Sequence, residues 1–276
     1  MVTKKASKKS SILNRIQPVS ELKENLIMLV YGKADTGKTE FASTWPKPIL
    51  FLGFNEKGMD TVVGKDGIDI LELQTWDDLQ DIYWELEAGM DYNTIVLDQI
   101  TSMQGFAIDD MRRKMKKKEG ELISQKNWGQ VSGAMKTWIE NFRNLSERYN
   151  LCFLGHERGF NSGDDEEDSV INPSIGAAIM PSVNNYITGA VTAIGNTFIR
   201  ERWEVENKEE VRYIDFCMRT GPSAYYFTKI RRPVAAGPVD EFIVNPTYDK
   251  VRTLMAGGSL NKRKKSRRKT HGSKKQ

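Results

Sequence analysis

The sequence contains few cysteines, few histidines and no long apolar run. It has two Cys and two His in 276 residues, without the close spacing that a zinc site needs. Cys152 and Cys217 both lie in apolar segments, which is typical of buried, reduced thiols. The longest apolar stretches span about six residues, as in 26–31, whereas a membrane helix needs about 20. With no apolar segment after the basic N-terminal residues, we expect no secretory leader, no membrane contact and a cytoplasmic location.

The net charge of +4 is distributed unevenly along the chain. Residues 261–276 carry nine Lys or Arg and no acid, and residues 1–20 carry five and no acid. The remaining residues, 21–260, hold 27 basic and all 37 acidic side chains, a net charge of about −10. We expect 1–20 to be a basic flexible arm and 257–276 a disordered basic tail. Such ends bind phosphate polymers through counterion release. The alternatives are a tail that improves solubility or a nuclear localisation signal.

The central part of the chain alternates between short apolar segments and amphipathic ones. Strands are expected at 26–31, 48–54, 94–97 and 151–154, and helices at 38–45, 76–88, 102–119 and 131–145. A loop is expected at 157–175, further strands at 190–199, 211–218, 224–230 and 242–244, and a last helix at 248–256. We therefore predict one α/β domain at 21–256. Its sheet is mostly parallel and flanked by helices, with antiparallel strands added at the C-terminal end.

A phosphate-binding motif follows the first predicted strand. The pattern G-x-x-x-x-G-K-[ST] is formed by Gly32, Lys33, Ala34, Asp35, Thr36, Gly37, Lys38 and Thr39. The two glycines allow the backbone to turn its N–H groups onto phosphate oxygens. Lys38 reaches the β- and γ-phosphates, and Thr39 offers its hydroxyl to Mg²⁺. Because the motif lies between a buried strand and a helix, it predicts ATP and Mg²⁺ binding. We expect the Lys38 side chain to be solvated when no ligand is bound.

Asp98 is the candidate partner of Thr39 at the metal. It ends the apolar segment 94–97 and follows Thr39 by 59 residues. Its carboxylate is predicted to hold Mg²⁺, through water, together with the Thr39 hydroxyl.

Two further polar residues follow predicted strands. Glu56 comes after the second strand, where a carboxylate could orient and deprotonate the attacking water; the alternative is a surface side chain in a turn. His156 ends the fourth strand, where a polar group could contact the γ-phosphate. Its alternative role is to cap neighbouring backbone.

A dense basic segment follows the strand that carries Asp98. Its positive residues are Arg112, Arg113, Lys114, Lys116, Lys117 and Lys118. Contact with nucleic acid is one interpretation, and a solvated helix face is the other.

Taken together, these residues resemble the RecA-like ATPases. The resemblance is greatest to the phage P-loop nucleotide-binding proteins, described in some cases as AAA-type, that act as recombinase-like single-strand annealing factors. It covers about residues 24–256. The stretches that carry it are LIMLVYGKADTGKTEFA, ILFLGFNEKG, YNTIVLDQIT, KNWGQVSGAM, LCFLGHER and YYFTKIRRP.

The resemblance implies roles for several residues. Glu56 matches the catalytic glutamate after the second strand, and His156 stands where such proteins carry a γ-phosphate sensor. Lys229 and Arg231 match a pair of basic residues that reaches the ATP of a neighbouring subunit, as an arginine finger does; the alternative is a positively charged strand edge.

The chain departs from the family pattern in two places. The segment after His156 would face DNA in the family, but here it contains the acidic run 164–168. Gln99 follows Asp98 where a small hydroxyl residue is common.

The expected function is therefore a Mg²⁺-dependent, DNA-stimulated ATPase that acts on single-stranded DNA in phage recombination or replication. It would work in the host cytoplasm as a homo-oligomeric ring or filament, with a single-strand binding protein as a candidate partner. A nucleotide-dependent interaction module or loader with little DNA affinity is the main alternative, and a small-molecule kinase is the third. Neither a lid nor an acceptor base for a kinase is evident in the sequence.

Overall fold

The structure is a computed structural model that describes residues 25–54, 59–118, 120–160, 174–206 and 209–260. The predicted arm 1–20, residues 261–276 of the predicted tail 257–276, and the acidic run 164–168 lie outside these residues. The first four residues of that predicted tail are ordered, since Ser259 and Leu260 both donate to the Asp240 carboxylate. Within the described part of the chain, no helix has the length and apolar character that crossing a bilayer requires.

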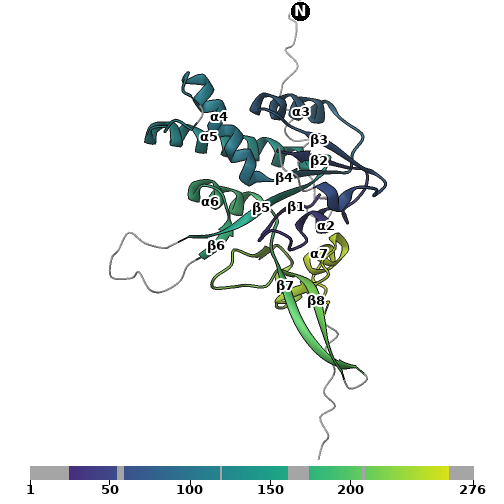
Figure 1. Cartoon of the computed structure of the whole chain (residues 1–276). Coiled ribbons are helices and arrows are strands. Elements are labelled where there is room, and N and C mark those ends of the chain that lie inside the picture. The colour runs from purple at the N-terminus through teal and green to yellow at the C-terminus, as the bar shows by residue number, and fades with distance from the viewer. Residues whose placement is uncertain (1–24, 55–58, 119, 161–173, 207–208, 261–276) are drawn as a thin grey trace, which may run out of the picture.

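One mixed sheet forms the centre of the fold (Figure 1). Its strands are β1 (Ile27–Gly32), β2 (Ile49–Gly53), β3 (Ile68–Glu72), β4 (Thr94–Asp98), β5 (Asn150–Phe160), β6 (Ser174–Ala177), β7 (Ala193–Glu206), β8 (Glu209–Arg219), β9 (Lys229–Ile230) and β10 (Phe242–Val244). The order across the sheet is β10-β8-β7-β1-β5-β4-β2-β3, with β6 paired to β5 and β9 to β7. Strands β7, β1, β5, β4, β2 and β3 are parallel, and β8, β10, β6 and β9 join antiparallel. The predicted sheet is thus confirmed.

Helices cover both faces of the sheet (Figure 1). They are α2 (Lys38–Ala42), α3 (Trp76–Ala88), α4 (Ile100–Lys114), α5 (Gln125–Asn144), α6 (Pro181–Ala190) and α7 (Tyr248–Met255), with short 3₁₀ turns at Met59–Val62, Leu145–Glu147 and Val234–Ala236. Helices α3 to α6 pack on one face, and α2 and α7 on the other.

The alternation of side chains along β1 explains why this strand is apolar throughout. Ile27, Leu29 and Tyr31 belong to the core under α3 to α6. Met28 and Val30 belong to the core under α2 and α7. Successive side chains of a strand point to opposite faces, so a strand covered on both faces needs a continuous apolar run.

Several elements have the bounds that the sequence predicts, and others do not. The helix predicted at 76–88 is α3, which begins at a capping box between Thr75 and Asp78. Both cysteines are buried free thiols, as expected. In contrast, α5 begins at Gln125 rather than at residue 131, α2 ends at Ala42 rather than at 45, and β9 has only two residues of the predicted 224–230.

Two elements, β3 and α6, were not expected at all. Strand β3 is an edge strand with exposed side chains, so it lacks the apolar run of a central strand, and its pairing with β2 defines it. Helix α6 contains Asn, Thr and Gly, which are poor helix formers. It forms because Pro181 occupies its first turn and Val183 and Ile187 are buried against the core.

The expected loop at 157–175 is also partly wrong. Strand β5 continues to Phe160 and pairs antiparallel with β6 from Glu157 to Phe160. This pairing, which local sequence does not encode, extends the strand beyond the apolar segment 151–154.

Candidate nucleotide-binding site

The motif at 32–39 forms the connection between β1 and α2, at the carboxyl end of the central strand. Gly37 has a φ of 83° and Asp35 a φ of 59°, so the backbone turns through the left-handed region twice. The Thr36 hydroxyl donates to the Lys33 carbonyl at 2.8 Å and closes the loop. A glycine is favoured at position 37 because other side chains are strained at this φ.

Gly32 and Thr197 hold the loop against strand β7. Thr36 Oγ1 and Thr197 Oγ1 are 2.7 Å apart and share a hydrogen bond. A Cβ at Gly32 would lie 2.2 Å from Thr197 Oγ1 and 2.6 Å from the Thr197 carbonyl oxygen, so only glycine fits. Sequence reasoning missed Thr197, because 161 residues separate it from Thr36 and no local pattern distinguishes it.

The Lys38 side chain lies over the loop and is only 6% exposed. Its ammonium donates to the carbonyls of Lys33 at 2.7 Å and Gly32 at 3.3 Å. The expectation that this side chain is solvated without ligand is therefore wrong. These carbonyls satisfy the buried charge, and they hold the ammonium at the loop that the motif assigns to phosphates.

Thr39 and Asp98 are in direct contact. The Thr39 hydroxyl donates to Asp98 Oδ2 at 3.2 Å, and Asp98, the last residue of β4, is 5% exposed. A hydroxyl and a carboxylate oxygen that converge beside a phosphate-binding loop are the hard oxygen donors that Mg²⁺ prefers. The residues thus fit the predicted metal.

Strand β5 lies between β1 and β4, which places His156 between the loop and Asp98. His156 is aligned with Gly32 in the parallel register. Its backbone N–H donates to Thr101 Oγ1 at 3.2 Å, and its carbonyl accepts from the Ala178 N–H at 2.7 Å. The position at the carboxyl edge is the one predicted, and the sensor role remains a prediction.

Glu56 lies outside the described residues. Strand β2 ends at Gly53, whose register partner on β4 is Asp98. The strand that precedes Glu56 therefore ends beside Asp98, and the catalytic role of this glutamate remains a prediction.

Lys229 and Arg231 lie far from the loop of their own chain. Strand β9 pairs with the first two residues of β7, at the end opposite to the phosphate-binding loop. Both side chains donate to carbonyls at the C-terminal end of α6: Lys229 to Thr188 at 2.7 Å and Val191 at 2.8 Å, and Arg231 to Gly189 at 3.4 Å. Cations are favourable at such an end. Burial, with a contribution from Arg231, lowers the pKa of Lys229. The role of this pair at the ATP of a neighbouring subunit remains a prediction.

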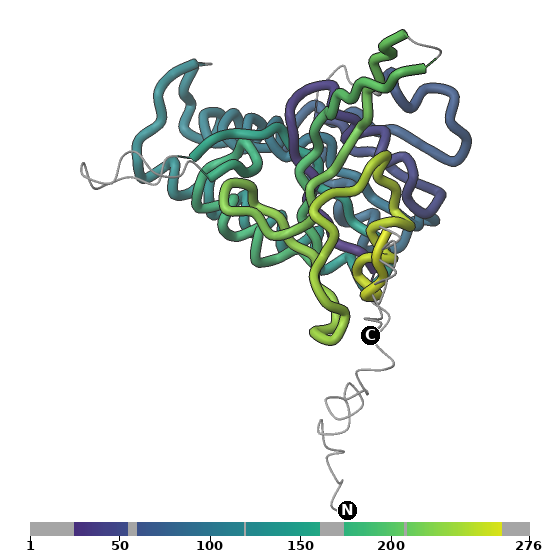
Figure 2. The backbone as a smooth tube through the Cα atoms, turned by 90° about the horizontal axis from the view of Figure 1, so that it is seen from below, coloured from purple at the N-terminus to yellow at the C-terminus, as the bar shows by residue number. Residues whose placement is uncertain are grey.

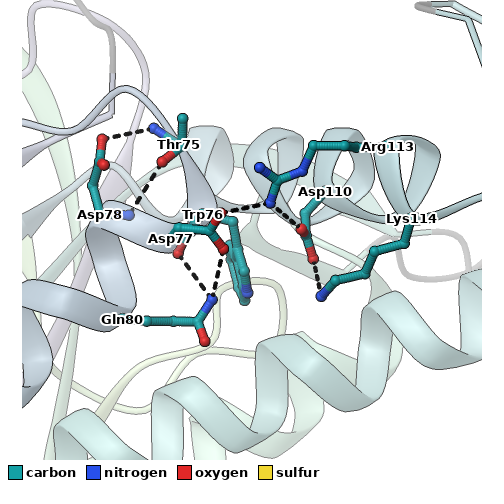
Figure 3. A network of polar contacts seen from close by, with 8 residues as sticks. All are labelled: Thr75, Trp76, Asp77, Asp78, Gln80, Asp110, Arg113 and Lys114. Atoms are coloured by element: carbon teal, nitrogen blue, oxygen red, sulfur yellow. Dashed lines mark hydrogen bonds and ion pairs between the residues drawn. The ribbon is translucent and has the colours of Figure 1, made fainter. Parts of the chain in front are cut away.

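The basic segment is largely neutralised by acidic neighbours (Figure 3). Arg113 and Lys114 both contact Asp110, at 2.8 and 2.6 Å, and Arg113 also contacts Asp77 at 2.8 Å. The Asp110 side chain is only 7% exposed. Arg112 pairs with Asp109, and Lys117 with Glu121. Three of these cations lie in the last turn of α4, which stabilises the helix end.

The fold and the site together define a class of protein. A P-loop that follows the central strand of a mostly parallel sheet, with an acidic residue at the end of a nearby strand, defines a P-loop NTPase fold. The family model of an AAA domain matches residues 24–232, most of the chain, so the protein belongs to this AAA domain family. The match indicates nucleotide binding and ATPase activity. A comparison with curated proteins finds no match.

Proposed function

We propose that this protein is a RecA-like ATPase that binds ATP and Mg²⁺ and acts on single-stranded DNA. The observation that carries the nucleotide part is the 3.2 Å contact between Thr39 and Asp98 beside the phosphate-binding loop. Asp98 ends a central strand and Thr39 lies in the first turn of α2, so both proposed metal ligands lie at one edge of the sheet before any ligand binds.

In this proposal the residues of the site have separate roles. Backbone N–H groups of 32–39 bind the phosphates, and Lys38 exchanges its bonds to loop carbonyls for bonds to the β- and γ-phosphates. Thr39 and Asp98 hold the Mg²⁺, whose charge offsets the charge of the phosphates. Glu56 accepts a proton from the attacking water, and His156 contacts the γ-phosphate.

The support for a DNA substrate is the charge at the two ends of the chain. Residues 261–276 carry nine positive side chains and no acid, whereas the rest of the chain after residue 20 is acidic. A basic end of this composition binds single strands through counterion release, and this binding weakens as salt increases. We infer annealing or strand pairing in phage recombination or replication, by a homo-oligomer.

A second function, a nucleotide-dependent interaction module, is favoured by one observation. Arg113 and Lys114 are committed to Asp110, and Arg112 to Asp109. DNA phosphates would have to compete with these ion pairs, so half of the predicted DNA-binding cluster contributes little free positive charge. DNA affinity would then rest on the basic ends of the chain.

The test is the rate of phosphate release with and without single-stranded DNA, over a series of salt concentrations. It compares the full chain, the Lys38→Ala variant and a chain lacking 261–276. We expect DNA to stimulate hydrolysis, the stimulation to fade as salt increases, and Lys38→Ala to hydrolyse no ATP. Removing the tail should reduce the salt slope of DNA binding by about 0.7 for each lost phosphate contact.

The other outcomes separate the alternatives. A rate that DNA does not change at any salt concentration would contradict the DNA substrate and favour the interaction module. A rate that depends on an added metabolite would favour a kinase. Normal turnover in folded Lys38→Ala would contradict the site itself.

A further inference from the structure

Strands β7 and β8 continue beyond the phosphate-binding loop as a long hairpin that extends from the body of the fold (Figures 1 and 2). Strand β1 ends at Gly32, which pairs with Thr197 of β7. The next residue of β7 on the same face is Ile199, and Phe216 of β8 lies directly opposite it. This pair is therefore the first row of side chains beyond the loop.

The face that carries this row is the face of the loop. The Thr197 hydroxyl contacts the Thr36 hydroxyl of the loop, so side chains two residues further along β7 point to the same side. The ring of Phe216 lies against the loop itself. A Cβ placed on Gly37 would lie 3.2 Å from Phe216 Cδ1 and 3.7 Å from Cγ.

The row is apolar and open to solvent. Ile199 is 43% exposed and Phe216 is 42% exposed. Large apolar side chains cost free energy when they remain in water, and an aromatic ring beside a phosphate-binding loop provides a surface on which a flat base can stack. The ring lies where a side chain at position 37 would meet it, which sets its place relative to the phosphate-binding loop.

The same face continues towards the tip of the hairpin with exposed Ile214, Trp203 and Val205, which alternate with the ion pair of Glu201 and Arg212. Trp203 lies four residues beyond Ile199, about 13 Å along the strand. Phe216 lies beside Gly37 of the loop and Ile199 lies opposite Phe216, so a nucleotide held by its phosphates meets this row first.

The geometry points to Ile199 and Phe216 as the platform for the nucleobase of the bound nucleotide, with Phe216 as the stacking residue. This inference rests on the proposed nucleotide binding and names the residues that receive the base. Gly37 then has two roles, since it permits the left-handed turn and leaves room for the ring.

The test compares the affinities of the full chain for ADP, GDP and inorganic pyrophosphate by calorimetry at constant Mg²⁺. We expect Phe216→Ala to weaken ADP binding by at least about fivefold, the lower end of base stacking on an aromatic ring. Its affinity for pyrophosphate, which has no base, should not change. Because stacking is tolerant of base identity, GDP binding should fall by a similar factor. Phe216→Trp should retain ADP affinity.

Ile214→Ala is the matched control, since Ile214 is exposed on the same face of β8 but lies one row further from the loop. It should leave all three affinities unchanged. Equal losses for ADP and pyrophosphate in Phe216→Ala would overturn the platform and show that the ring supports the loop. Unchanged ADP affinity together with lost self-association in sedimentation would also overturn it, in favour of a protein contact. A wild-type chain that binds neither ADP nor pyrophosphate would overturn nucleotide binding itself, and the platform with it.

Discussion

The Thr39 hydroxyl donates to Asp98 Oδ2 at 3.2 Å, although the two residues are 59 positions apart in the chain. Thr39 lies in the first turn of helix α2, and Asp98 ends β4, with β5 between β4 and the strand that leads to the loop. The fold thus brings together two oxygen donors from separate elements, and the proposed binding of Mg²⁺ depends on this contact.

Asp98→Asn should abolish the effect of Mg²⁺ on nucleotide binding. The amide keeps the shape and an acceptor for the Thr39 hydroxyl but removes the charge that attracts the metal. We expect the affinity for ADP with Mg²⁺ to fall by at least about tenfold, the scale for residues that support a bound metal. Calorimetry with and without Mg²⁺ measures the change, and an equal benefit from Mg²⁺ in variant and wild type would contradict the assignment.

Glu56→Gln should retain ATP binding and slow hydrolysis by at least about a hundredfold, the scale of a lost general base. The amide has nearly the same size and cannot accept the proton. Single-turnover hydrolysis and ATP affinity are measured on the same preparation. A variant that binds ATP far more weakly would show that Glu56 has a structural role.

The double variant Lys229→Ala, Arg231→Ala should bind ATP normally and hydrolyse it poorly. In their own chain both side chains contact the end of α6, so a role at phosphates requires a neighbouring subunit. Mixing this variant with Lys38→Ala should restore some activity. The double variant supplies an intact phosphate-binding loop, and Lys38→Ala supplies Lys229 and Arg231. Urea unfolding of the double variant is the control for the lost helix contacts. Mixtures that assemble without exceeding the summed separate rates would contradict action in trans.

Gly32→Ala should destabilise the protein, whereas Gly129→Ala should not. A methyl group at position 32 would clash with the side chain and the backbone of Thr197, and such overpacking costs about 1–3 kcal/mol. Around Gly129, in helix α5, no atom of another part of the described structure lies within 4 Å of the added methyl group. Alanine there should raise the free energy of unfolding by about 0.5–1 kcal/mol. Urea denaturation of both variants measures the contrast, and similar values for the two would contradict it.

Asp215 should make the stability of the chain sensitive to acid. Its carboxylate accepts from Arg200 at 2.6 Å and from Arg202 at 3.1 Å, and these bonds, that from Arg200 above all, lower the pKa of Asp215. The folded protein therefore binds the proton less tightly than the unfolded chain, where the pKa of Asp is about 3.9. The stabilisation is complete above that pKa and disappears as the pH falls through the lower folded pKa.

The measurement is the free energy of unfolding of wild type and Asp215→Asn at a series of pH values. The difference between them should be largest above about pH 5 and should shrink as the pH falls below about 4. A difference that does not depend on pH would show that folding does not lower the pKa of Asp215.

Much of the nucleotide site is encoded locally. The motif from Gly32 to Thr39 is recognisable because one short loop must turn sharply, expose its N–H groups and carry Lys38. Asp98 is recognisable because an apolar strand buried on both faces ends there in a charge. The helix at 76–88 is equally clear, since its cap and its apolar stripe both lie within its own sequence. Short-range geometry dictates each of these features.

The tertiary structure decided the rest, because the deciding contacts join residues far apart in the chain. Thr197 packs on the loop, and Phe216 lies against Gly37, only because β7 and β8 pair beside β1. Most ion pairs of the basic segment join residues three or four positions apart, but the contact of Arg113 with Asp77 depends on α3 and α4 lying side by side. Strand β3 and helix α6 form although their local sequences favour neither, since pairing with β2 and burial against the core supply the free energy that propensity does not.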